Sequence, residues 1–257
     1  RVLGPHQTSD KWIKWDPSEG PSGLQAYVDQ TGPIHAMIVL AGAVPGRSET
    51  LLDNTTIVEN CLAAAQAVGI GHVLISSSSA VYGAQAGQDF SETSDVSPQN
   101  DYGRSKRAAE IFAADVEGVH TTCLRIGNVA GADMLLGNAQ SRAEGAFLQL
   151  DIYPDGTGPI RSYVGPMTFA NILANLVTKR GSLPRILNIA APKPVEMEKL
   201  LQAVNCPYIK RDVAESPAER IVLDCSQLLN FYDFNNREMD ANDMVGQWKQ
   251  IMKYVEQ

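Results

Sequence analysis

The stretch that decides the fold covers residues 72–106, and its two ends read HVLISSSSAVYG (72–83) and DYGRSKRAAE (101–110). The first end is a short apolar run that predicts a strand, and this strand finishes in four serines, Ser76 to Ser79. The second end predicts a helix, in which Tyr102 and Lys106 stand four residues apart. Positions i and i+4 of a helix share one face, so both side chains are expected to point toward the same neighbour.

That neighbour is predicted to be the serine-bearing end of the strand, because ligands of parallel α/β sheets bind outside the carboxyl ends of the strands. A free tyrosine titrates near ~10, and a nearby positive charge lowers this pKa. Lys106 supplies one such charge, and an oxidised nicotinamide would supply a second. Ser78, Tyr102 and Lys106 are therefore predicted to form a catalytic proton-transfer site, in which Ser78 orients the substrate oxygen. The alternative is an ordinary surface tyrosine and lysine on an amphipathic helix.

The segments on both sides alternate between strands and helices. An apolar run within residues 34–46, bounded by Gly32 and Pro33, predicts a fully buried parallel strand. Further strands are predicted at 121–126 and 186–189, and helices at 54–68, 139–149, 169–179, 195–204 and 243–255. The helix that carries Tyr102 is expected to have Asn100 or Asp101 as its cap. The pattern predicts a doubly wound parallel α/β sheet with a small C-terminal lobe.

Composition narrows the class of protein and of partner. The chain has 257 residues, of which 44% are hydrophobic and 19% charged, as in ordinary globular proteins. Its net charge of −8 argues against nucleic acid or an anionic membrane as a partner, and the longest apolar stretch, residues 36–44, is too short to span a membrane. The cysteines lack any CxxC spacing, so we expect no metal site and reduced thiols in a cytoplasmic protein. These cysteines are Cys61, Cys123, Cys206 and Cys225.

The motifs also carry a family resemblance. SSSSAVYG, followed by YGRSK from Tyr102 onward, resembles the extended short-chain dehydrogenase/reductase family of NAD-dependent nucleotide-sugar epimerases and dehydratases. The resemblance implies a Rossmann-like fold, NAD as the cofactor with NADP not excluded, and hydride transfer on a nucleotide sugar or a related carbinol. It also implies that the third serine, the tyrosine and the lysine are catalytic, which are Ser78, Tyr102 and Lys106 here. A homodimer is a further expectation from the family.

The resemblance implies a set of cofactor-binding residues. These are Asp16, Leu40, Ala41, Gly42, Ala43, Asn54, Ser76, Tyr102, Lys106 and Gly127. Three of the assignments have a structural alternative. Asp16 is also suited to a solvent-facing turn, and Gly42 and its neighbours to a tight strand-to-helix turn. Asn54 could bond strand-end backbone near the cofactor, and its alternative is a plain polar residue in the first turn of a helix.

On the substrate side, the resemblance implies contacts from Ser78, Asn128 and Arg161. Arg161 is the candidate for a substrate phosphate because a guanidinium bonds two oxygens at once, and a salt bridge at the rim is its alternative. Arg125 is expected to form a structural pair. Residues 165–168 read Gly-Pro-Met-Thr where the family has His-Val-Asp-Asp, which puts the usual nucleotide-sugar substrate in doubt.

The start of the chain departs most from the family pattern. A nucleotide-binding fold of this type opens with a strand, a glycine-rich turn and a helix, and no G-x-x-G-x-x-G lies in the first forty residues. We therefore hypothesise that an N-terminal β-α unit precedes residue 1 in the native protein. The expected dinucleotide-binding domain covers residues 1–128 and about 166–190, and the substrate-binding lobe covers 129–165 and 191–257.

The sequence leaves several functions open. The first is an epimerase/dehydratase-type enzyme with Tyr102 as its acid/base. A simple NAD(P)-dependent reductase of a small carbonyl substrate is a second, and a cofactor-sensing protein without catalysis is a third. A dehydratase is disfavoured because Ser79 and Ala80, rather than an acidic residue, follow Ser78.

Overall fold

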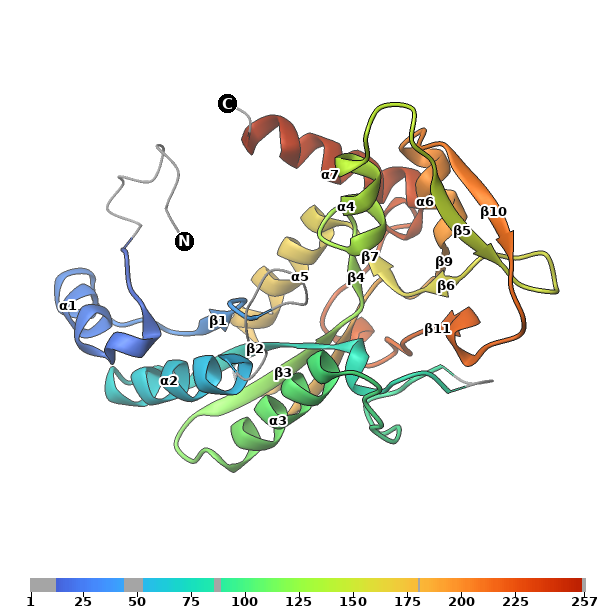
Figure 1. The fold of residues 1–257 in the computed structure, drawn as a ribbon. Helices are drawn as coiled ribbons and strands as arrows, with labels where there is room; N and C mark the ends of the chain where they lie inside the picture. The colour runs from blue at the N-terminus through green and yellow to red at the C-terminus, as the bar shows by residue number, and fades with distance from the viewer. Residues whose placement is uncertain (1–12, 44–52, 86–88, 180, 256–257) are drawn as a thin grey trace.

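A four-stranded parallel sheet forms the centre of the chain. The computed structural model describes residues 13–43, 53–85, 89–179 and 181–255. The strand order is β1-β2-β3-β8 and every pairing is parallel (Figure 1). The bounds are β1 (Met37–Val39), β2 (His72–Ser78), β3 (His120–Ile126) and β8 (Ile186–Ile189). The sheet confirms the predicted parallel α/β fold.

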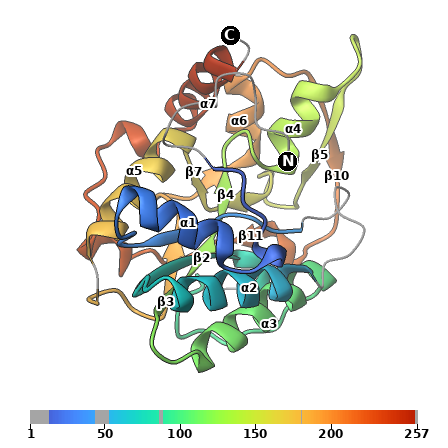
Figure 2. The same ribbon diagram turned by 90° about the vertical axis from the view of Figure 1, so that its left-hand side faces the viewer.

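Helices cover both faces of this sheet. α2 (Asp53–Ala67) and α3 (Asp101–Asp115) lie side by side on one face (Figure 2), and α5 (Pro166–Thr178) covers the other. Alternate residues of a strand face opposite sides of a sheet. Val73 and Ile75 accordingly pack with α2 and α3, whereas Leu74 packs with α5. Both faces of β2 are therefore apolar until its serines begin.

The strand predicted within residues 34–46 is only partly as expected. β1 is parallel and short, and Val39 is buried, but Ile38 is 37% exposed and Leu40 54% exposed. Full burial was therefore wrong. Among the described residues β1 pairs with β2 alone, so its second edge stays open and its apolar side chains are less covered. Residues 44–46 lie outside the described residues.

Most of the remaining elements build a smaller second part of the molecule (Figure 1). Its β-structure consists of the parallel pair β5-β10, the three-stranded β11-β6-β9 and the pair β4-β7. The strands are β4 (Asn128–Val129), β5 (Leu148–Ile152), β6 (Ile160–Arg161), β7 (Tyr163–Val164), β9 (Val195–Glu196), β10 (Tyr208–Asp212) and β11 (Arg220–Ile221). The helices are α4 (Met134–Ser141), α6 (Met197–Ala203) and α7 (Ala241–Val255), and α1 (Ser22–Thr31) lies near the start of the chain. Short 3-10 helices occupy Pro17–Glu19, Ser79–Val81, Pro217–Glu219, Leu228–Asn230 and Arg237–Met239.

The helix predicted at 139–149 was wrong in position. α4 begins earlier because the Asp133 side chain accepts a hydrogen bond from the Leu136 amide at 2.9 Å and so caps its first turn. Residues 148–152 are a strand instead, in which Leu150 and Ile152 are buried against the lobe core. Their spacing of two residues is that of a strand.

Among the described residues no helix is both long and apolar enough to cross a membrane.

A buried ion pair joins α3 to the sheet. Glu110 on α3 accepts from Arg125 Nε and Nη2 of β3, each at 2.9 Å, and both side chains are nearly inaccessible. Ser77 of β2 donates to the same carboxylate at 2.6 Å. Burial alone would raise the pKa of Glu110, but the hydrogen bonds and charge of Arg125 outweigh it and hold that pKa below its usual value. The expected structural role of Arg125 is confirmed.

We predict that Arg125→Met strongly destabilises the fold. The change removes the buried partner of the Glu110 carboxylate and leaves it only one ion-pair partner, the partly exposed Arg107, whose Nη1 lies 3.0 Å away. This loss costs up to about 3–5 kcal/mol of unfolding free energy. Urea unfolding at neutral pH measures the loss. Arg104→Met is the matched control, because Arg104 forms an exposed pair with Asp101, and such pairs contribute about 0–1 kcal/mol. Equal unfolding free energies for the two variants would contradict the prediction.

Candidate active site

A cavity of about 300 Å³ lies at the carboxyl ends of the parallel strands. It brings together most of the residues that the sequence singled out, from the serine run, α3 and the ends of β1 and β3. The lining includes Leu40, Gly42, Ser76, Ser77, Ser78, Tyr102, Lys106, Ile126, Gly127, Asn128, Val129, Ala132, Asp133 and Phe169. Ligands of parallel α/β sheets bind at this edge, so the cavity is the candidate active site.

Helix α3 positions the tyrosine and the lysine on the wall of this cavity. Its cap is Asn100, whose side chain accepts from the Gly103 amide at 2.8 Å. Gly103 sits close against the Ala80 carbonyl, where a Cβ would lie only 2.5 Å away. This close approach places the first turn of α3 directly over the loop that follows the serines. Lys106 Nζ lies 6.0 Å from the centre of the Tyr102 ring.

Lys106 is held by the backbone of the serine run. Its Nζ donates to the Ser76 carbonyl at 3.0 Å and lies 3.5 Å from the Ser76 hydroxyl. The residue is only 5% exposed, and this burial lowers the pKa of Lys106 to about 8. Its amine is therefore mostly protonated at neutral pH, at the edge of its titration range.

The Tyr102 phenol experiences two opposed effects. Burial raises its pKa, and the interaction with the Ser78 hydroxyl opposes that rise without cancelling it. Lys106 was predicted to lower the pKa of Tyr102, but it is not among the groups that shift this pKa in the structure. Ser78 Oγ also accepts from the Ala80 amide at 3.2 Å, which fixes the hydroxyl beside the phenol. Ser78 and Tyr102 are thus brought together, while the activation of the tyrosine by Lys106 stays a prediction.

Asn54 holds the end of β1 rather than lining the cavity. Its Oδ1 accepts from the Ala43 amide at 2.9 Å, and its Nδ2 donates to the Ala43 carbonyl and to Ser105 Oγ, each at 3.0 Å. A Cβ on Gly42 would lie 2.9 Å from Asn54 Oδ1 and 3.0 Å from Lys106 Nζ. The absence of a side chain at Gly42 therefore keeps the wall of the cavity open beside the lysine.

The end of β3 forms the opposite wall. The Gly127 amide donates to the Ile189 carbonyl at 3.0 Å, and a Cβ on Gly127 would lie 2.7 Å from the Ser162 carbonyl. Asn128 Nδ2 donates to that same carbonyl at 3.3 Å. The end of β3 can approach the Ser162 backbone this closely only because residue 127 is glycine, and the next residue, Asn128, joins the cavity lining.

Comparison with known proteins agrees with this arrangement. The model of the NAD dependent epimerase/dehydratase family matches residues 12–158. The chain belongs to this family. UDP-glucose 4-epimerase of Rhizobium leguminosarum bv. trifolii is 32% identical over 136 residues, which are 48% of this chain and 42% of that protein. The enzyme of the same name from Azospirillum brasilense is 28% identical over 201 residues, which are 69% of this chain and 58% of that protein.

The fold is shared with solved members of the group. The structure of UDP-glucose-4-epimerase from Stenotrophomonas maltophila, with bound NAD and formylated UDP-arabinopyranose, matches with a TM-score of 0.74. The match covers 95% of this chain and 83% of that one at 21% identity. The chain thus spans 42% and 58% of the two curated relatives and a larger share of the solved structure.

Ala43 and Asn54, which bond each other, lie outside the cavity lining, and so do three further residues expected to bind ligands. Asp16 is exposed and caps a 3-10 turn by accepting from the Ser18 amide and hydroxyl, which also lower its pKa. Ala41 is exposed. Arg161 Nη1 donates hydrogen bonds to the carbonyls of Ile160 and Glu219, at 2.8 and 3.1 Å. Their family roles stay predictions.

Asp133 is a lining residue that the sequence reasoning missed. Its Oδ1 caps α4, whereas Oδ2 is buried and forms no hydrogen bond of normal length among the described residues. Burial raises the pKa of Asp133, and a weaker interaction with the Tyr163 hydroxyl opposes the rise. In sequence this residue reads as a helix cap, and only its position beside Asn128 in the cavity suggests contact with a ligand.

We predict that Lys106 is unusually reactive toward amine-directed acylating reagents. Its acylation rate should rise with a midpoint near pH 8, the pKa that burial produces, because only the neutral amine reacts. Quantitative peptide mass spectrometry at short reaction times gives the rate at each pH. The same lysine in the urea-denatured chain is the control, with a midpoint expected near ~10.4. Identical midpoints in folded and denatured protein would contradict the burial of this amine.

Proposed function

We propose that the chain belongs to an NAD-dependent enzyme that oxidises and reduces a carbinol of a nucleotide sugar. The observation that carries the proposal is the convergence of Ser78, Tyr102 and Lys106 in one cavity at the strand ends. Membership of an NAD dependent epimerase/dehydratase family supports it. Both curated relatives are UDP-glucose 4-epimerases by name, which makes UDP-glucose the first substrate to assay.

The cavity wall suits a nicotinamide cofactor. Gly42 and Gly127 carry no side chains where the backbone comes closest to neighbouring groups, and Lys106 presents a buried amine between them and the serines. Leu40, Gly42, Ser76, Lys106 and Gly127 would hold the nicotinamide and its ribose. When bound, this cofactor supplies the hydride acceptor and donor. The two-part division proposed for the chain places these residues in the dinucleotide-binding part.

In the proposed mechanism the protein moves one proton. The Tyr102 phenolate takes the proton from the carbinol oxygen as the carbinol is oxidised, and the phenol returns it on reduction. Ser78, beside the phenol, donates a hydrogen bond to the reacting oxygen and keeps it in line. Burial dominates in the structure and raises the pKa of Tyr102. In this proposal the positive charges of Lys106 and of the oxidised nicotinamide would together favour the phenolate.

We predict that Tyr102→Phe abolishes most of the activity and spares cofactor binding. Loss of general acid/base catalysis lowers kcat by about 10²–10⁴-fold, while the retained ring keeps the cavity filled. The full-length protein is titrated with NAD and with NADP by calorimetry, and UDP-glucose conversion is followed by chromatography. Tyr254→Phe is the matched control, since Tyr254 is 71% exposed and far from the cavity lining.

Two results would overturn this proposal. Activity of Tyr102→Phe equal to that of the parent would remove the tyrosine from the mechanism. Binding of NAD by the parent without turnover of any sugar nucleotide would favour a cofactor-sensing protein instead.

We also propose that Asp133 accepts a hydrogen bond from a substrate hydroxyl. Asp133→Asn keeps the cap of α4, because asparagine caps helices as well as aspartate does, but removes the charge of the buried oxygen. We expect KM for the sugar nucleotide to rise by about tenfold, as for loss of a charged hydrogen bond of roughly 1.5 kcal/mol. Steady-state kinetics measures the change, and thermal unfolding checks that the cap remains. An unchanged KM with unchanged stability would assign Asp133 to capping alone.

A further inference from the structure

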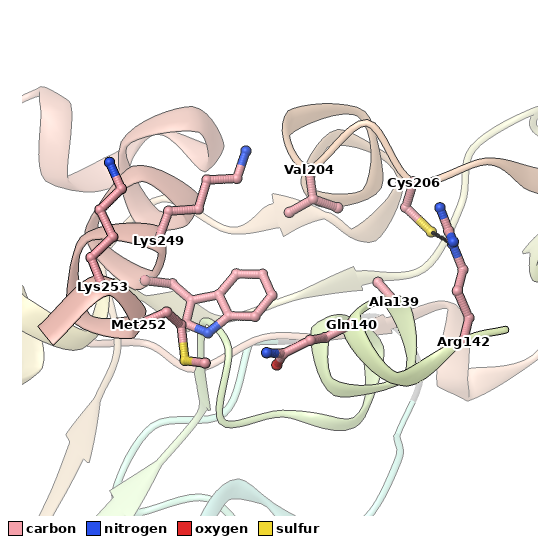
Figure 3. A pocket seen from close by; sticks show the side chains of 9 residues that line it. Ala139, Gln140, Arg142, Val204, Cys206, Lys249, Met252 and Lys253 are labelled. Carbon is pink, nitrogen blue, oxygen red and sulfur yellow. Dashed lines mark hydrogen bonds between the residues drawn. The ribbon is translucent and has the colours of Figure 1, made fainter. Parts of the chain in front are cut away.

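A second cavity lies on the far side of α4, away from the serines and Tyr102. It has a volume of about 430 Å³ and is bounded by α7, the end of α4 and the turn after α6 (Figure 3). Its lining consists of Ala139, Gln140, Arg142, Val204, Cys206, Trp248, Lys249, Met252 and Lys253. We call it the α7 pocket. Its volume is within the range of about 300–1,000 Å³ that is typical of small-molecule sites.

The charge of the α7 pocket is opposite to that of the whole chain. The chain has 29 acidic and 21 basic residues, yet the pocket is lined by three basic side chains and no acidic one. Within the described residues none of the three takes part in an ion pair: Lys249 donates to the Ala203 carbonyl at 3.2 Å, and Arg142 contacts the Cys206 sulfur at 3.4 Å. These neutral partners leave the positive charges uncompensated, which favours an anionic ligand.

Apolar side chains form the base of the pocket between these charges. Trp248, Met252 and Val204 supply this apolar lining, and Met252 comes from α7 whereas Val204 follows α6 (Figure 3). An indole face packs well against another planar ring, and lysine or arginine at the rim pairs with carboxylate, sulfonate or phosphate. An apolar base with a cationic rim therefore fits one molecule that has both a flat ring and an anionic group.

Trp248 also connects this pocket to the candidate active site. The indole packs on Gly131, where an added Cβ would overlap the ring. Gly131 has a φ of +86°, which favours glycine. It lies in the short turn between Asn128 and Asp133, both of which line the catalytic cavity. A ligand that shifts the indole would therefore act on Gly131, which directly precedes Ala132 of the active-site lining.

We propose that the α7 pocket binds an aromatic anion. Through Trp248 and Gly131, its occupancy stabilises the turn of residues 129–133, which we call the active-site turn. The binding step needs neither NAD nor a sugar nucleotide. It is therefore tested separately from the proposed enzymatic function, and failure of one leaves the other intact.

Calorimetry of the full-length protein with naphthalene-2-sulfonate tests the binding step. Naphthalene-2-methanol, which lacks the charge, and methanesulfonate, which lacks the ring, are expected to bind at least about tenfold more weakly. The double variant Arg142→Gln/Lys253→Gln should weaken sulfonate binding by about tenfold, whereas Lys14→Gln, at an exposed lysine outside the pocket, should leave it unchanged. Equal binding of the sulfonate and the alcohol, or of parent and double variant, would show an adventitious hydrophobic probe only.

Fluorescence locates the bound ring. Naphthalene-2-sulfonate should quench tryptophan emission in the parent and in Trp15→Phe, and the quenching should be lost in Trp248→Phe. Quenching retained in Trp248→Phe would place the ligand elsewhere and overturn the assignment. Adenosine 5′-monophosphate and 1-naphthoate, used as competitors, distinguish a phosphate-bearing from a carboxylate-bearing ligand, and failure of both to compete would count against the proposed chemistry.

Action on the active-site turn is measured by amide hydrogen exchange with saturating naphthalene-2-sulfonate. We expect the exchange of residues 129–133 to slow by about threefold or more, because local opening of this turn must displace the indole. The same measurement on Arg142→Gln/Lys253→Gln is the control. Unchanged exchange in the parent would confine the proposal to binding, and would overturn the coupling.

Discussion

The buried ion pair between Glu110 and Arg125 is the interaction on which the rest of the structure depends. It joins α3 to β3, and Ser77 of β2 bonds the same carboxylate. Three elements are therefore fixed by one group that is costly to leave unpaired. Because Glu110 lies one turn beyond Lys106 on α3, this pair also sets the rotation of the helix. The tyrosine and the lysine then face the end of the sheet rather than solvent.

Some serines of the run hold the structure together, and Ser78 lies where it could contact the substrate. Ser77 belongs to the buried ion-pair network, the Ser76 carbonyl holds Lys106, and Ser78 lies beside Tyr102. Neighbouring residues of a strand point in opposite directions, so a run of identical side chains can serve both purposes. The serine-rich stretch is therefore more than a polar loop, because each of these serines has a specific partner.

The start of α5 is joined to the smaller part of the molecule through an amide side chain, a hydroxyl and one carboxylate. Gln247 of α7 accepts from the amides of Met167 and Thr168, each at 3.0 Å, and the Thr168 hydroxyl donates to Glu238 at 3.1 Å. These residues occupy the place of the His-Val-Asp-Asp segment expected from the family. The start of α5 is thus held from outside by α7, and the missing acids do not leave this junction unbonded. Helix α7 consequently contributes both to this junction, through Gln247, and to the α7 pocket, through Trp248.

The sequence by itself determined the local elements and the catalytic candidates. Apolar runs ending in serines and the four-residue spacing of Tyr102 and Lys106 are local patterns, and local periodicity is visible in sequence. The helix predicted at 139–149 was placed too late in the chain. The apolar spacing there looks helical, but the Asp133 cap starts α4 earlier.

Only the tertiary structure decided which groups are buried together. The lowered pKa of Lys106 arises from burial against the backbone of a distant strand. Asn54 bonds the Ala43 backbone after β1, as the sequence allowed, but it does not line the cavity. The turn after β4 places Asp133 in the lining of the cavity. Desolvation and long-range hydrogen bonds depend on residues far apart in the chain, and spacing along the sequence does not encode them.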